Sequence, residues 1–253
     1  TSRSNLRVNG KRIETRIFEL AKFGRDENGR GYRVGYTTGD REGRTWFIDL
    51  MNKAGLEVSI DEGGNIIGRR KGKKASLKPI AFGSHIDMVP DGGNYDGTLG
   101  SLSALEVIEI LNENKIVTEH PLEVIVFANE EGGLIGSKAI VGQLTEAGLQ
   151  QISQSGLVMA DGIKAIGGNP DQIKNAIRTQ GAFHAFVELH IEQGGTLEAE
   201  NLQIGVVEGI VGIVDWEIEV EGLANHAGTT PMNLRMDALL ASSKLIITVN
   251  EVI

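Results

Sequence analysis

Two short apolar runs limit what the chain can fold into, because each has the length and composition of a strand that is buried on both faces. They are residues 79–83 (PIAFG) and 122–128 (LEVIVFA). Between them, residues 99–111 carry apolar side chains at helical spacing. This strand–helix–strand order is typical of a crossover unit, so we predict an α/β fold with a largely parallel sheet flanked by helices.

Further elements are predicted on both sides of this unit. They are helices at 11–24 and 45–54 and strands at 56–60, 66–67 and 183–190. The polar, Gly-rich residues 25–39 are typical of a surface loop, and the basic run at 69–74 is predicted to be a solvated hairpin tip. After residue 210 the character changes: residues 215–221 alternate as a strand, and residues 238–249 have helical spacing.

The net charge of the 253 residues is −9, which argues against nucleic acid or an anionic membrane surface as the main partner. No apolar run reaches the length of a membrane span, and the N-terminal residues lack an apolar signal core, so we expect a cytoplasmic protein. The chain has no cysteine. Any metal ion must therefore be bound by His, Asp and Glu side chains.

Candidate metal ligands follow the first apolar run directly, in the stretch GSHIDMVPDGGNYDG at residues 83–97. His85 and Asp87 are two residues apart, so their side chains point to the same side of an extended segment. One of them can bind a metal ion while the other orients its ring. Asp96 follows a Gly-rich turn that can fold back to the same point, and we expect its carboxylate to bridge two metal ions.

The second apolar run is followed by Asn129, Glu130 and Glu131. Successive side chains diverge, so one carboxylate of the pair can bind metal while the other faces an activated water molecule as a general base. The predicted strand at 183–190 also ends in a possible ligand, His190.

Each of these motifs alone has an ordinary structural explanation. A His-x-Asp pair can be a histidine satisfied by a local hydrogen bond, a Glu-Glu pair can be a solvated loop end, and His190 can be a half-buried strand residue. Together, however, they follow three predicted strands, and ligands of parallel sheets bind beyond the carboxyl ends of the strands. The coincidence favours a hydrolytic metal site.

At these residues the sequence resembles a known family. The matching stretches are GSHIDMVPDGGNYDG, FANEEGGLIGS, ELHIEQGGTLE, IGVVEGIVG and ANHAGTTPMNLRMDAL. They resemble the metal-dependent amidohydrolases of the hydantoinase/carbamoylase branch, within the aminoacylase and carboxypeptidase-like metallopeptidase superfamily. HIEQG and NHAGTTPM distinguish this branch from its peptidase relatives, which usually carry a carboxylate ligand at the position of His190.

The resemblance implies a site with two divalent metal ions, most simply zinc, with manganese, cobalt or nickel as alternatives. His85, Asp96 and His190 would bind one ion. Asp96 would bridge to the second ion, which Glu131 would also bind. The same resemblance assigns the general base and the orienting residue: Glu130 would be the base, and Asp87 would hold His85 in place.

The resemblance also implies substrate contacts and a domain organisation. Gln193 would touch the substrate, and His226 would bind or polarise its carbonyl group. Residues 1–210 would be a zinc-exopeptidase-like catalytic domain, and residues 211–253 the start of an α+β lid and dimerisation domain. The last metal-binding histidine of the family, with a lid Asn and a lid Arg, would lie beyond Ile253. We therefore expect the N-terminal part of a longer enzyme, poorly active alone and homodimeric through the lid at full length.

The activity implied is hydrolysis of a linear, non-peptide C–N bond in an N-carbamoyl amino acid or a ureido acid such as allantoate. Two alternatives remain. One is a dipeptidase or aminoacylase of the same superfamily, against which His190 argues. The other is an inactive metal-binding fragment.

Overall fold

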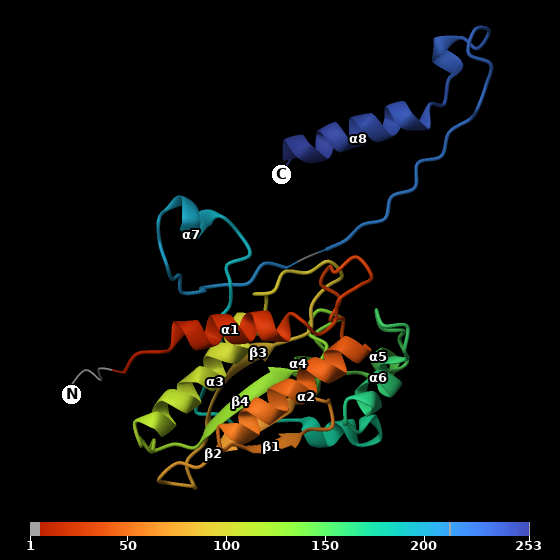
Figure 1. Cartoon of the computed structure of the whole chain (residues 1–253). Helices are drawn as coiled ribbons and strands as arrows, with labels where there is room; N and C mark the ends of the chain where they lie inside the picture. Colours follow the sequence, from red (N-terminus) through yellow and green to blue (C-terminus); the bar gives the residue numbers. More distant parts are fainter. Residues whose placement is uncertain (1–5, 213, 253) are drawn as a thin grey trace. The chain divides into compact units, whose positions relative to one another are not determined.

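The computed structural model describes residues 6–212 and 214–252, and the chain divides into two compact units, Thr1–Gly195 and Thr196–Ile253 (Figure 1). The first unit contains all the candidate ligands that follow the predicted strands. The second contains His226. The expected boundary between a catalytic domain and a lid domain, after residue 210, stays a prediction.

The first unit is built on a five-stranded sheet with the order β1-β2-β4-β3-β5. Its strands are β1 Glu57–Ile60, β2 Ile66–Arg70, β3 Ile80–His85, β4 Leu122–Phe127 and β5 Ala185–Val187. Strands β1, β2 and β4 pair antiparallel, whereas β4, β3 and β5 pair parallel. The predicted α/β sheet flanked by helices is confirmed, and the sheet is mixed, because β1 and β2 form a hairpin along its edge.

Helices cover both faces of the central strand β4. The helices of this unit are α1 Gly10–Leu20, α2 Thr38–Lys53, α3 Thr98–Glu113, α4 Ile135–Ile140, α5 Glu146–Leu149, α6 Met159–Ala165 and the 3₁₀ helix η1 Pro170–Ala176. Val124 and Val126 of β4 pack into a core with α1, α2 and α3, while the intervening Ile125 packs against Ile140 of α4. Burial on both faces explains why this strand reads as a continuous apolar run.

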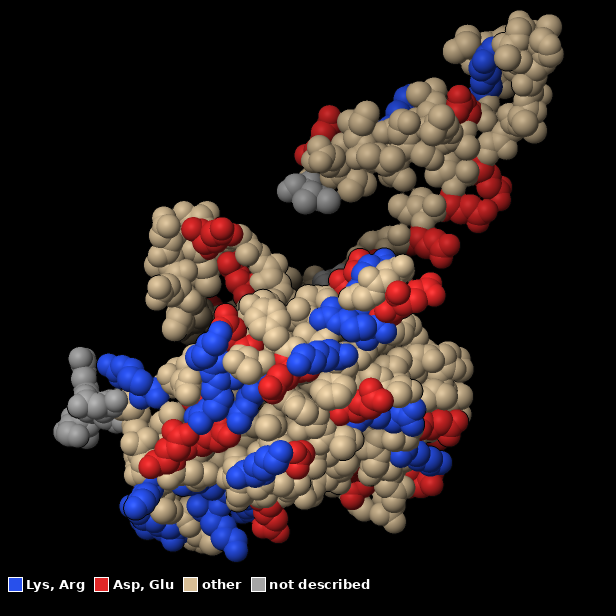
Figure 2. Space-filling view, in the orientation of Figure 1, with Lys and Arg blue, Asp and Glu red and all other residues tan. Residues whose placement is uncertain are grey.

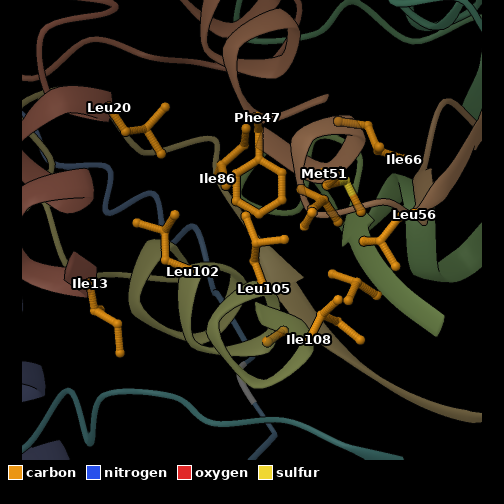
Figure 3. Close-up of a cluster of buried hydrophobic side chains, with 14 of the residues drawn as sticks. Ile13, Leu20, Phe47, Met51, Leu56, Ile66, Ile86, Leu102, Leu105 and Ile108 are labelled. Carbon is orange, nitrogen blue, oxygen red and sulfur yellow. The ribbon is translucent and has the colours of Figure 1, made fainter. Parts of the chain in front are cut away.

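The main core lies between the sheet and helices α1, α2 and α3 (Figure 3). Phe47 and Met51 of α2 meet Leu102, Leu105 and Ile108 of α3 in it (Figure 3), and all five side chains are buried. This packing fixes α3 between strands β3 and β4, and therefore fixes the turn that precedes α3.

Three local expectations differ from the structure. Helix α2 begins at Thr38, seven residues before the predicted start, because the Thr37 side chain caps it by accepting a hydrogen bond from the backbone of Asp40. Residues 33–36, expected in a surface loop, are buried. The basic run at 69–74 is not a hairpin tip, because it leads from β2 to β3 and β4 lies between these strands.

Basic side chains gather around this connection in Figure 2, and Lys73 and Lys74 lie 3.1 and 3.2 Å from the carboxylate oxygens of Glu119. The positive charge of the run is thus partly neutralised by Glu119.

The second unit contains α7 Thr196–Ala199, the 3₁₀ helix η2 Met232–Leu234 and α8 Ala238–Val252, so the helix predicted at 238–249 is present. An isolated bridge joins Leu223 and Met236. The strand predicted at 215–221 does not form, because no partner strand pairs with these residues in the part of the chain that is described. No helix among the described residues is both long and apolar enough to cross a membrane.

We expect Leu105→Ala to lower the free energy of unfolding by about 2–5 kcal/mol, because it leaves a cavity in the core between α2, α3 and the sheet. Val107 lies on the same helix but is 40% exposed, so Val107→Ala should change the free energy by no more than about 0.5 kcal/mol. Chemical denaturation of both variants measures the difference. Equal losses would contradict the position of this core.

Candidate metal centre

Three segments with possible ligands leave the sheet at the same edge. His85 is the last residue of β3, and its neighbours on either side, β4 and β5, run parallel to it. Glu130 and Glu131 follow the end of β4, and His190 follows the end of β5. Because the carboxyl ends of parallel strands meet at one edge, the three segments converge, as the sequence predicted.

His85 is buried and is held in one orientation from two sides. Its Nδ1 lies 3.0 Å from the backbone carbonyl of Asp87. A carbonyl only accepts, so Nδ1 donates and Nε2 keeps its lone pair. On the other side the ring lies against Gly97, which has φ of +57° and where a Cβ atom would overlap the imidazole. Gly97 is therefore required both by its backbone conformation and by the ring behind it.

Asp96 lies between the two histidines. Its Oδ1 is 3.7 Å from Nε2 of His85 and 3.2 Å from Nε2 of His190. Nδ1 of His190 lies 2.9 Å from the Ile191 carbonyl, so this ring too directs a lone pair from Nε2 toward Asp96. Oδ1 is buried and has no hydrogen-bond partner among the described residues. Gln193 donates to the other oxygen, Oδ2, at 2.7 Å.

Asp87 joins the ends of β3 and β4. Its carboxylate accepts hydrogen bonds from the backbone N–H groups of Glu130 (3.2 Å) and Glu131 (3.1 Å). Oδ1 of Asp87 is 3.7 Å from Nδ1 of His85, so the short contact to the ring comes from the Asp87 carbonyl rather than from its carboxylate.

The turn after β4 is made by Asn129 in the left-handed region (φ +45°), which Asn tolerates better than most residues.

The electrostatics favour a cation at this edge. Burial raises the pKa of Glu130, and it raises the pKa of Glu131 to about 7, with the neighbouring carboxylates adding to the effect. Burial opposes protonation of His85, but the negative charges of Asp87 and Glu130 outweigh it and raise the pKa of the ring. A divalent cation relieves this crowding of carboxylates, since it lowers the energy of their charged forms.

Among the residues that the structure describes, two groups of side chains have ligand atoms close enough to share a metal ion. In each, the atoms lie within 4.8 Å of one another: His85, Asp96 and His190 in the first, and His85, Glu130 and Glu131 in the second. The first is the set predicted for one ion. In the second, His85 rather than Asp96 is the residue shared between the groups. The buried Oδ1 of Asp96 has no hydrogen-bond partner among the described residues and faces two imidazole nitrogens, which fits a bound cation.

His226 belongs to the second unit, and its role stays a prediction. Its Nδ1 accepts hydrogen bonds from the backbone N–H groups of Gly228 (3.0 Å) and Thr229 (3.2 Å). The ring is therefore held with Nε2 available as a donor.

Sequence reasoning missed the residues that support the ligands. Residues 33–36 are buried behind the site: the Ile86 carbonyl accepts a hydrogen bond from Arg33, and a Cβ atom at Gly35 would overlap the Asn129 side chain. The apolar side chains of Val34 and Tyr36, on either side of Gly35, were the signal that this segment is not a solvated loop.

A family model described as peptidase family M20/M25/M40 matches residues 81–249. An N-carbamoyl-L-amino acid amidohydrolase of Geobacillus stearothermophilus is 39% identical over 249 residues, which are 96% of this chain and 61% of that protein. A ureidoglycolate hydrolase of Oryza sativa subsp. japonica is 35% identical over 96% of this chain and 52% of its own. A crystal structure of an amidase of the hydantoinase/carbamoylase family from Burkholderia multivorans has a TM-score of 0.81 at 36% identity, covering 98% of this chain and 61% of that one.

We expect Gly97→Ala to lower stability more than Gly29→Ala. Both glycines have positive φ, but a Cβ atom at Gly29 meets nothing within 4 Å, whereas one at Gly97 overlaps the His85 ring. Gly29→Ala should cost about 1–2 kcal/mol for its backbone conformation. Gly97→Ala should cost roughly 1–3 kcal/mol more and shift the ring resonances of His85 in NMR spectra. Equal losses with an unperturbed His85 would contradict the packing of Gly97 on the ring.

Proposed function

Because the chain belongs to peptidase family M20/M25/M40, a metal-dependent family, we propose that its protein hydrolyses a linear, non-peptide C–N bond in an N-carbamoyl amino acid or a ureido acid. The observation that carries the metal part of this proposal is the orphaned Oδ1 of Asp96 between two imidazole lone pairs. The chain spans 61% of the length of the carbamoylase relative from Geobacillus stearothermophilus.

In this proposal His85, Asp96 and His190 hold one divalent ion, and Glu131 with Asp96 holds part of a second. Zinc is the first choice, and manganese, cobalt and nickel suit the same mixture of imidazole and carboxylate. The chemistry that such ions supply when bound is Lewis acidity, which acidifies water and polarises a carbonyl group.

Glu130 is the proposed general base. Its Oε2 lies 3.7 Å from Nε2 of His85, at the edge of the ligand cluster, and about 30% of the side chain is exposed. It can therefore reach a water molecule beside the ligands. Its raised pKa makes the carboxylate a better proton acceptor than a solvated one. Glu130 then takes a proton from the attacking water and delivers it to the leaving nitrogen.

The substrate class rests on the relatives, which are named for N-carbamoyl-L-amino acids and ureidoglycolate. His190 supports the same choice, because it fills the first ligand group where a peptidase-like site would offer a carboxylate. Three further points stay predictions. They are substrate contacts by Gln193 and His226, a homodimer formed through the second unit, and a cytoplasmic location.

We expect Glu130→Gln to lower kcat by roughly 10²–10⁴-fold in the full-length enzyme while its metal content stays near wild type, because the amide cannot accept a proton. His190→Ala is the matched comparison: it should lose metal, because it removes one of the three side chains of the first ligand group. Steady-state kinetics with metal analysis of both purified variants tests the two roles. Normal turnover by Glu130→Gln would remove it as the base, and full metal content in His190→Ala would remove that ligand.

We expect the full-length enzyme to hydrolyse N-carbamoyl amino acids or ureido acids such as allantoate at least tenfold faster, as kcat/KM, than dipeptides or N-acetyl amino acids. An ammonia-release assay and an amino-acid-release assay on a matched panel measure this ratio. Preference for dipeptides or N-acetyl amino acids would establish the peptidase or aminoacylase alternative. Metal binding without turnover on the whole panel would favour a non-catalytic metal-binding protein.

A further inference from the structure

Arg33 is a buried arginine directly behind the candidate metal centre, with only 1% of its surface exposed. Its Nε donates a hydrogen bond of 2.6 Å to the carbonyl of Ile86. Ile86 stands between His85 and Asp87, and its carbonyl belongs to the peptide that joins it to Asp87, so this bond holds the peptide that leads to the residue orienting His85.

The same guanidinium reaches two other segments. Nη1 donates to the carbonyls of Leu20 (3.0 Å) and Phe23 (3.2 Å), where helix α1 ends. Nη2 lies 3.4 Å from the hydroxyl of Thr98, the first residue of α3 and two residues after Asp96. One side chain thus ties the segments of His85 and Asp96 to the end of α1.

The backbone beside Arg33 pairs with the same ligand segment. Met88 N–H donates to the Arg33 carbonyl at 3.1 Å, and Asp91 N–H donates to the Gly31 carbonyl at 2.8 Å. The segment at 31–33 therefore follows the chain that leaves β3 for several residues, and the side-chain bond to Ile86 extends this pairing toward the ligand itself.

Two glycines leave space for Arg33 in the packed interior. A Cβ atom at Gly24 would lie 2.7 Å from the Arg33 Cα, and one at Gly43, on α2, would lie 3.0 Å from its Cδ. Both distances are shorter than ordinary contacts, so Gly24 leaves room for the backbone of residue 33 and Gly43 leaves room for the Arg33 side chain. Gly43 stands inside a helix, where glycine is less stable than alanine, so the space that it leaves has a cost in stability.

The guanidinium keeps its positive charge although it is buried. Burial lowers the pKa of Arg33 to about 10, so the group stays charged at neutral pH, and the negative charges of Asp40 and Asp87 favour this form. Hydrogen bonds from a charged donor are stronger than neutral ones, so the hold on the Ile86 carbonyl is firm.

We propose that Arg33 is a positioning residue of the metal centre, which fixes the Ile86 peptide and thereby directs Nε2 of His85 toward Oδ1 of Asp96. The link runs through one further bond: the Asp87 carbonyl that accepts from Nδ1 of His85 belongs to the residue after Ile86. If the Ile86 peptide rotates, the acceptor of the imidazole moves with it. This inference rests on the metal centre of the proposed function.

The test compares Arg33→Met with Arg12→Met in the full-length protein. Arg12 is the matched control because its Nε pairs at 2.6 Å with Glu106, whose side chain is fully buried, on the α1–α3 contact away from the ligands. Both variants remove a guanidinium from the same unit and should lower the midpoint of thermal unfolding. The probe is Co²⁺, whose affinity is measured by chelator competition and whose visible absorption bands report the geometry of its ligands.

We expect Arg33→Met to weaken Co²⁺ binding roughly 10–100-fold, the usual effect of losing a group that orients a metal ligand, and to change the intensity of the visible bands. Arg12→Met should bind Co²⁺ within about twofold of wild type. Arg33→Lys keeps the charge but not the forked donors, and it should lose several-fold in affinity. Should Arg33→Met not fold, Arg33→Lys decides by the same two readouts.

Wild-type Co²⁺ affinity and spectrum in Arg33→Met, or in Arg33→Lys where only that variant folds, would overturn the positioning role. So would losses in Arg12→Met that match those in Arg33→Met, because both would then follow from stability alone. His85→Ala separates this inference from the metal centre itself. If His85→Ala binds Co²⁺ as wild type does, the centre is wrong; if it loses Co²⁺ and Arg33→Met does not, only the positioning role fails.

Discussion

The parallel pairing of β4, β3 and β5 is the constraint on which the site depends. Parallel neighbours need a crossover, and α3 supplies it between β3 and β4 by packing Leu102, Leu105 and Ile108 into the core. The parallel pairing brings the carboxyl ends of all three strands to one edge, where each is followed by ligands. The same chain segments in an antiparallel sheet would place the segments after β3 and β4 at opposite edges.

Polar side chains are also buried behind the ligands, at the carboxyl ends of the parallel strands. Asp87, Asn129 and Arg33 are each buried, and each bonds to the backbone of another segment or packs tightly on it. Buried polar groups contribute little net stability, but when they are satisfied they permit only one arrangement of the chain. The site is therefore supported by a layer of buried polar side chains. Their contacts determine the conformations of the turns that carry the ligands.

The ligand types and their places after strands could be predicted from the sequence, because apolar runs mark the strands and His85, Glu130 and His190 follow them. The support for the ligands could not. Apart from Val34 and Tyr36, residues 31–36 have the local composition of a loop, and residues 33–36 are buried by segments distant in the sequence, which include Ile86, Asn129 and Met159. The early start of α2 was hidden for a related reason: Gly43 reads as a poor helix residue, yet it leaves the space that the Arg33 side chain fills.

Asp96 shows how neighbouring polar side chains orient a ligand. Its carboxylate has two chemically different oxygens, because Gln193 donates to Oδ2 while Oδ1 faces His85 and His190 without a donor. The hydrogen bond from Gln193 to Oδ2 favours the orientation of the carboxylate in which Oδ1 faces the imidazoles. The unsatisfied atom is thus held in place by the rest of the site, at the one point where both imidazoles direct their lone pairs. A buried carboxylate oxygen without a hydrogen-bond donor lowers the stability of the fold. An oxygen held in this state is available to bind a cation.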